Sequence, residues 1–118
     1  MKASIAQALA RLPAAPTSNY PSGAPFISMM AGGTMSVEVF APNGADLQQP
    51  HAQDELYFIH SGTGRIVING QHFEAAAGDA FFVAAGVAHR FENFSNDFVT
   101  WVVFYGSLGG EQQHTRKI

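Results

Sequence analysis

The chain is divided into many short runs of apolar and β-branched residues, and this succession restricts its fold more than any other feature. The expected strands are residues 26–30, 35–40, 56–59, 65–68, 81–84, 90–94 and 98–105. Glycine and asparagine residues separate these runs, and Asn69-Gly70 is a strong β-hairpin signal. Many short strands broken by such turns are typical of a sandwich or a barrel. We therefore predict an all-β domain.

The last of these runs, residues 98–105, is apolar at nearly every position. A strand with one face in water would alternate between apolar and polar residues. Both faces of this strand should therefore be covered, one of them by the core of the domain. The other face could pack under the N-terminal arm or against a second subunit. We expect a homodimer, because small one-sheet proteins often associate to bury such a surface.

A short amphipathic helix is expected before the first strand. Ile5, Leu9 and Leu12 have helical spacing, Ser4 is a suitable N-cap, and Pro13 is a stop signal. The proline-rich residues that follow should form an irregular arm. The expected organisation is therefore a helix and arm over residues 1–25, a β-barrel over residues 26–106 and a polar tail over residues 107–118.

Composition limits the classes of function that this chain can serve. Its 118 residues are 47% hydrophobic and 13% charged, which is sufficient for one domain with a packed core. The net charge of −3 disfavours nucleic acid and anionic membranes as partners. The lack of cysteine excludes disulfides and thiolate ligands. The N-terminal stretch resembles neither a membrane span nor a signal peptide, so we expect a cytoplasmic protein.

Two polar segments beside expected strands contain the residues best suited to chemistry. The first holds Gln49, His51 and Glu55, and the second holds His89. Two imidazoles and one carboxylate can bind a divalent transition metal and leave coordination positions open. In an extended chain Gln49 and His51 would lie on one face. Glu55 would be too distant in a straight strand, so the chain must bend over residues 52–54.

The same two segments resemble the two halves of the cupin signature. The first half consists of His51, three residues, Glu55, six residues and Gly62. The second half consists of Gly78, five residues, Ala84, Ala85, Gly86, two residues, His89, three residues and Asn93. Two positions differ from the family pattern, because Ala84 replaces a proline and Gln49 replaces the first histidine.

This resemblance implies both a fold and a metal site. The fold would be the cupin double-stranded β-helix, a jelly-roll-like barrel, with the short N-terminal helix and arm outside it. The ligands would be His51, Glu55 and His89, with Gln49 as a candidate fourth ligand. The cofactor would be a divalent metal such as zinc, iron, manganese or nickel, since affinity alone does not set selectivity among them.

Other polar and aromatic residues are expected to have structural roles. His60, His72 and His114 fit neither half of the signature, and Asp54 and Asp79 are expected in turns. The charged pair Arg90 and Glu92 should face solvent, with a pocket role as the alternative. Tyr57, Phe91 and Trp101 are expected in the core or in a cavity wall.

Two main interpretations of function remain open at this stage. The first is a metal-dependent enzyme of the dioxygenase or isomerase type that acts on a small polar molecule held in the barrel. Such a substrate would chelate the metal through a polar head and place an apolar body against aromatic side chains. The second is a non-catalytic module that binds a small molecule or a metal. A third and weaker interpretation is a degenerate barrel that has lost its metal.

Overall fold

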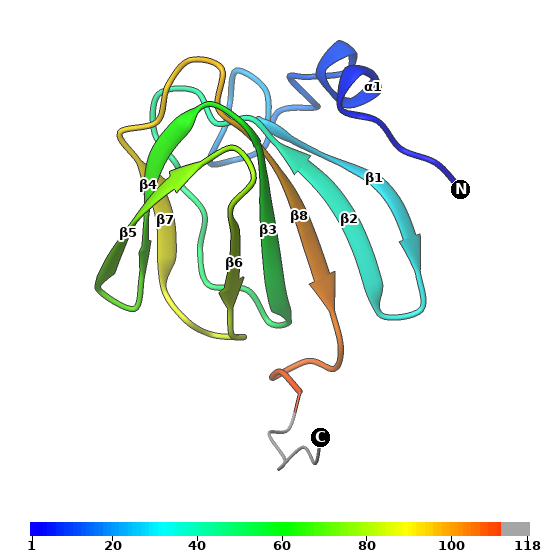
Figure 1. Cartoon of the computed structure of the whole chain (residues 1–118). Coiled ribbons are helices and arrows are strands. Elements are labelled where there is room, and N and C mark those ends of the chain that lie inside the picture. The colour runs from blue at the N-terminus through cyan, green and yellow to red at the C-terminus, as the bar shows by residue number, and fades with distance from the viewer. Residues whose placement is uncertain (112–118) are drawn as a thin grey trace.

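The computed structural model describes residues 1–111 and consists of two β-sheets that face each other (Figure 1). A short helix precedes the strands. The elements are α1 (Ile5–Ala10), β1 (Phe26–Gly32), β2 (Met35–Phe40), β3 (Asp54–Ser61), β4 (Thr63–Ile68), β5 (Gln71–Ala76), β6 (Ala80–Val83), β7 (His89–Glu92) and β8 (Val99–Tyr105).

The larger sheet has five strands in the order β1-β2-β8-β3-β6, and the smaller has three in the order β5-β4-β7. Every strand pairing is antiparallel. The prediction of an all-β jelly-roll-like fold with a short N-terminal helix is therefore confirmed. Strand β5 was absent from the expected set, because it begins with polar residues and Ala75 is its one buried side chain.

The hydrophobic core lies between the two sheets. Its buried members include Tyr57, Ile59, Ile66, Phe91 and Val102, which project inward from both sheets. On the inner face of β8, Thr100 and Val102 are buried and Phe104 is half-buried. On the outer face Val99 is buried, whereas Trp101 and Val103 are half-buried. The outer face of β8 is therefore covered at its Val99 end and partly exposed beyond it.

Helix α1 covers one end of that outer face. It is shorter than predicted, but Ser4 caps it as expected by accepting a hydrogen bond from the backbone N–H of Gln7. The fully buried residue is Ala8, which packs with Val39 and Val99, whereas Leu9 is 43% exposed. Because the small Ala8 side chain allows close approach to the sheet, the buried face of the helix differs from the predicted one.

The segment after α1 returns to the sheet as an irregular arm, and a β-bridge joins Ala14 to Ala24. Trp101 packs beside the α1 cluster on the outer face of the sheet, not in the wall of the cavity. Within residues 1–111 no helix is long and apolar enough to cross a membrane. Most of the predicted polar tail, including His114, lies outside the described residues.

Two glycines with similar backbone angles give a test of the fold. Gly62 has φ +81°, and a Cβ there would lie 2.7 Å from the Phe98 Cα, whereas Gly70 has φ +79° and open space around it. We expect Gly70→Ala to lower the free energy of unfolding by about 1–2 kcal/mol through backbone strain. Gly62→Ala should cost about 1–3 kcal/mol more, because of the clash with Phe98. Urea denaturation would measure both, and equal losses would contradict this packing.

Candidate metal site

The fold brings His51, Glu55 and His89 together at one end of the space between the sheets. Glu55 points inward from β3, His89 begins β7, and His51 lies in the loop that precedes β3. Nε2 of His89 is 3.0 Å from Oε1 of Glu55, and Nε2 of His51 is 3.9 Å from Oε2. One potential ligand atom from each of the three residues lies within 4.8 Å of the others.

The Glu55 carboxylate is the most unusual group in this site. Its side chain is 1% exposed, and neither oxygen receives a well-formed hydrogen bond from residues 1–111, although His89 lies close by. Burying an ionised carboxylate costs several kcal/mol unless a counter-charge or hydrogen-bond donors compensate. The carboxylate therefore needs a cation, supplied either by a protonated histidine or by a metal.

Backbone contacts between the two signature segments hold the histidines in place. The N–H of Gly86 donates a 2.8 Å hydrogen bond to the carbonyl of His51. The carboxylate of Asp54 accepts a hydrogen bond from the N–H of Ala85 at 2.9 Å. The chain bends before Asp54, at the start of β3, as the spacing of His51 and Glu55 predicts. The expectation that Asp54 lies in a turn is wrong, because it is the buried first residue of β3 and anchors the second segment through Ala85.

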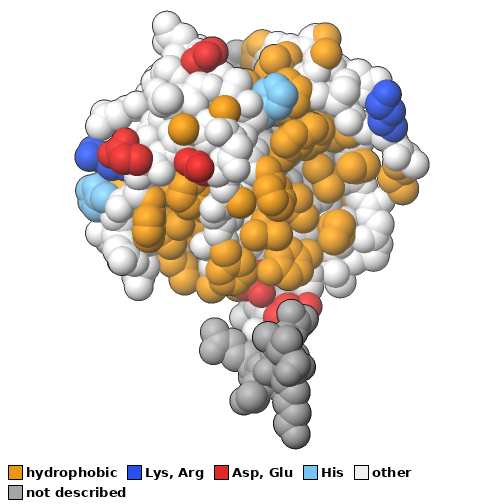
Figure 2. Space-filling view, viewed as in Figure 1, with side chains coloured by type: hydrophobic (Ala, Val, Ile, Leu, Met, Phe, Trp, Pro, Cys, Tyr) orange, Lys and Arg blue, Asp and Glu red, His pale blue; other side chains and the backbone are white. Residues whose placement is uncertain are grey.

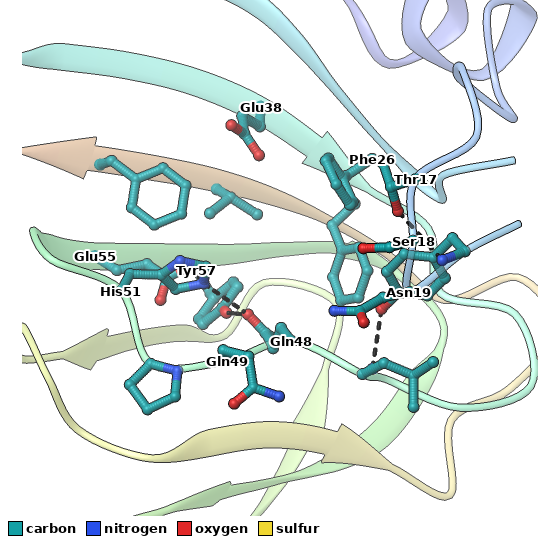
Figure 3. A pocket seen from close by; sticks show the side chains of 16 residues that line it. Thr17, Ser18, Asn19, Phe26, Glu38, Gln48, Gln49, His51, Glu55 and Tyr57 are labelled. Carbon is teal, nitrogen blue, oxygen red and sulfur yellow. Dashed lines mark hydrogen bonds and ion pairs between the residues drawn. The ribbon is translucent and has the colours of Figure 1, made fainter.

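Gln48 is the glutamine whose side chain reaches the histidines. Its Oε1 lies 3.1 Å from Nε2 of His51 and 3.1 Å from Nε2 of His89. Gln49 lines the adjacent cavity, and Figure 3 shows its amide turned away from His51. Gln49 and His51 were expected to point to the same side of an extended strand. They lie in a loop instead, so this expectation is wrong. Ligation by Gln49 stays a prediction.

Asp46 fixes the orientation of the Gln48 amide. One carboxylate oxygen of Asp46 accepts hydrogen bonds from Nε2 of Gln48 at 2.6 Å and from the N–H of Phe91 at 2.8 Å. Because the amide nitrogen donates to Asp46, Oε1 must face the histidines. Tyr57 completes this arrangement by donating its hydroxyl hydrogen to the same Oε1 at 2.9 Å. Gln48 therefore presents an oxygen lone pair to the site.

The pKa values of the two histidines are shifted in opposite directions. Nδ1 of His89 lies 2.8 Å from the carbonyl of Val87, which can only accept, so this nitrogen carries hydrogen and Nε2 faces the site. Burial acts to lower the pKa of His89, but contacts with Glu55 and Val87 outweigh it and raise the pKa above its ordinary value. Burial lowers the pKa of His51, and the attraction of Glu55 does not compensate.

The donor set fits a divalent metal ion. Imidazole nitrogens and carboxylate or amide oxygens converge, and the nearby hydroxyl of Tyr57 is directed to Gln48. Ligand bonds of about 2.0–2.2 Å would place neighbouring ligand atoms about 3–4 Å apart, similar to the spacing seen here. The orphaned carboxylate of Glu55 would gain the counter-charge that it lacks. His51, Glu55 and His89 could hold such an ion, with Gln48 beside it.

Sequence reasoning missed Asp46 and Gln48 as members of the site. It placed Tyr57 in the core or a cavity wall, which is confirmed, but it did not predict the contact of Tyr57 with Gln48. Tyr57 could have been assigned to the site, because it lies two residues after Glu55 on the same face of β3. Asp46 and Gln48 offered no such signal, since their positions depend on a loop without regular periodicity. Burial and the nearby Glu55 charge raise the pKa of Tyr57 well above its ordinary value, so its hydroxyl stays a donor.

The remaining polar candidates lie away from this group. Arg65 pairs with Glu92 at 2.8 Å and Arg90 also contacts Glu92, outside the cavity, which agrees with the solvent-facing interpretation. His60 and His72 are exposed, and Asp79 accepts a hydrogen bond from Ala76 in a turn.

Comparison with known proteins gives a consistent family match. The sequence model described as "Cupin domain" matches residues 36–105. An uncharacterised protein of Streptomyces coelicolor is 38% identical over 81 residues, which cover 67% of this chain and 77% of that protein.

Solved structures give the same fold. KdgF from Halomonas sp. has a TM-score of 0.61 at 14% identity, covering 68% of this chain and 76% of that one. The DMSP lyase DddQ from Ruegeria pomeroyi has a TM-score of 0.61 at 22% identity, covering 70% of this chain and 47% of that one. At these identities the similarity shows a shared fold alone.

The raised pKa of His89 gives a prediction for the metal-free protein. The stability that protonated His89 contributes should be complete below about pH 6.5, the ordinary value for histidine, and be lost as pH rises through the raised pKa. The free energy of unfolding of the wild type should therefore exceed that of His89→Gln most at low pH. Chemical denaturation from pH 5.5 to 8.5 would measure this, with the exposed His60→Gln as control. A difference that grows with pH would contradict the assignment.

Proposed function

This chain belongs to the cupin family, and on that basis we propose that it binds one divalent metal ion through His51, Glu55 and His89. The observation that carries the proposal is the buried Glu55 carboxylate, which faces two imidazole nitrogens and receives no well-formed hydrogen bond from residues 1–111. A small molecule would bind in the cavity beside the ion. Zinc, iron, manganese and nickel are all compatible with the nitrogen and oxygen donors.

Gln48 is the best candidate for a fourth, neutral donor. Its Oε1 is equidistant from the two histidine Nε2 atoms, and Asp46 holds the amide in the donating orientation. Hydrogen bonds of this supporting kind commonly set the orientation and basicity of a metal ligand. When bound, the ion would supply Lewis acidity or, in the case of iron, a centre for oxygen chemistry.

A metal-dependent enzyme of the dioxygenase or isomerase type is the first functional candidate. The protein groups would orient a small polar molecule and exclude water from it, since Phe40, Val102 and Phe104 line the cavity next to His51. The second candidate is a non-catalytic module that binds the metal or a small molecule. It is favoured by Tyr57, whose hydroxyl is engaged with Gln48 and whose raised pKa makes it a poor base.

Metal affinity of single variants tests the site and separates the two glutamines. Loss of a residue that only supports a ligand typically weakens metal binding by about 10–100-fold. His51→Ala and His89→Ala remove proposed ligands, so each should weaken metal binding by more than this. Gln48→Ala should weaken it by about tenfold, and Gln49→Ala by less. Competition titration with a zinc chelator would give these constants.

The outcomes of this titration separate the alternatives. Unchanged affinity in a His51→Ala/His89→Ala double variant would refute the site. A larger loss for Gln49→Ala than for Gln48→Ala would assign the fourth position to Gln49. Turnover of oxygen-rich acids, enediols or catechols by the metal-loaded protein would favour the enzyme over the binding module.

We also propose that the chain forms a homodimer through the outer face of its larger sheet. Apolar side chains form a row across four strands, in which Val37 pairs with Val103, Val103 with Leu56, and Leu56 with Phe82. Figure 2 shows hydrophobic side chains gathered over this sheet.

A second row lies next to the first and consists of Val39, Trp101, Phe58 and Ala80. Phe58 on β3 is 44% exposed and Phe82 on the edge strand β6 is 51% exposed, whereas Val39 is buried under α1. The two rows hold no charged residue. Two copies could therefore pair these rows about a twofold axis without burying an unpaired charge.

Sedimentation velocity at micromolar concentration tests this proposal. The wild type should sediment as a dimer, and Phe58→Glu should sediment as a monomer, because it would bury a charge at the centre of the interface. Phe73→Glu is the matched control, since Phe73 is also exposed but lies on β5 of the other sheet. A monomeric wild type would reject the dimer.

A further inference from the structure

The candidate metal site opens into a cavity of about 420 Å³ between the sheets. This volume lies within the range of about 300–1,000 Å³ that small-molecule sites occupy. The inner face of the larger sheet forms one wall of the cavity, and Phe26, Phe40 and Phe104 are among its lining residues. The cavity is therefore large enough for a ligand that extends well beyond the metal group.

The N-terminal arm closes the cavity at the end away from His51. Thr17, Ser18 and Asn19 line it there, and Figure 3 shows them across the cavity from His51 and Glu55. The arm is fixed by Tyr20, whose hydroxyl accepts a 2.9 Å hydrogen bond from the N–H of Leu47. The edge of the Tyr20 ring also packs on Phe26, with ring centroids 6.0 Å apart. These contacts make the arm a structural wall of the binding cavity.

Glu38 is the one charged side chain in this cavity that the metal group does not use. It projects from the inner face of β2 toward the same space as His51 and Glu55 (Figure 3). Within residues 1–111 its carboxylate has neither a hydrogen bond nor an ion pair. Burial, and secondly the charge of Glu55, raise the pKa of Glu38. A carboxylate on the core-facing side of a sheet without a protein partner points to a ligand that would pair with it.

The charges around the cavity favour a cation as that partner. Glu38 and Glu55 line the cavity, and no lysine or arginine does so among the described residues. Asp46 adds a further negative charge behind Gln48. An organic anion would find no protein cation here, whereas the aromatic walls offer ring faces that attract organic cations. The cavity is therefore matched to a positively charged head group and an apolar body.

We propose that Glu38 is the specificity residue of this cavity and binds the protonated amino group of a small amine, whose apolar body packs against Phe26, Phe40 and Phe104. This inference deepens the proposed function, because the metal group lies in the same cavity. The amine site itself is formed by residues that do not require the metal. It can therefore be tested in metal-free protein, and its failure is distinguishable from failure of metal binding.

The test uses three compounds with the same apolar body and different head groups: phenethylamine, 2-phenylethanol and phenylacetate. Protein NMR titrations at pH 7, after dialysis against a chelator, would give the dissociation constants. Phenethylamine should bind about tenfold more tightly than either of the others, as expected for a charge-assisted hydrogen bond. Glu38→Gln should remove this advantage and leave the affinity for 2-phenylethanol unchanged.

Two further variants make the outcome decisive. Glu74→Gln removes the same charge from exposed strand β5 and should leave the preference intact. Glu38→Asp keeps the charge and should retain part of the preference, which provides a second measurement if Glu38→Gln does not fold.

Equal binding of phenylacetate and phenethylamine, no binding of the amine, or an unchanged amine affinity in Glu38→Gln would each overturn the inference.

Discussion

The carboxylate of Glu55 is buried, and His89 and His51 are its nearest potential counter-charges among residues 1–111, so the structure around it depends on how this charge is balanced. Nε2 of His89 lies 3.0 Å from the carboxylate, and the Gln48 amide is held so that it adds a further lone pair. An arrangement of acceptors that face one another is unfavourable unless a cation lies between them. A proton on His89 satisfies this need in the metal-free protein, and a divalent ion would satisfy it more completely.

The same contacts that converge on Glu55 also shape the cavity beside it. Asp46 ties the loop before β3 to β7 through the N–H of Phe91, and the N–H of Gly86 ties the second loop to His51. Because these bonds fix both loops, the cavity wall and the metal group form one structural unit. Glu38 faces this unit from β2, so a ligand could contact the ion and the carboxylate together.

Much of the fold could be predicted from the sequence, since turn-bounded strands and the two signature segments are local patterns. The convergence of His51, Glu55 and His89 required the family resemblance, because their spacing only permits it. Gln48 and Glu38 could not be predicted by this route. The direction of Gln48 depends on its bond to Asp46 in an irregular loop. Glu38 lies on the inner face of β2, where charged side chains are rare, so composition alone gives no signal for it.

The central claim is that the convergent acceptors bind a metal, and anomalous diffraction tests it most directly. Crystals grown with zinc or manganese should show one strong anomalous peak per chain, about 2.0–2.2 Å from the nearest nitrogens of His51 and His89 and from the Glu55 carboxylate. The Gln48 oxygen should be the next donor. A peak only at His60 or His72, or none at all under metal excess, would contradict the account.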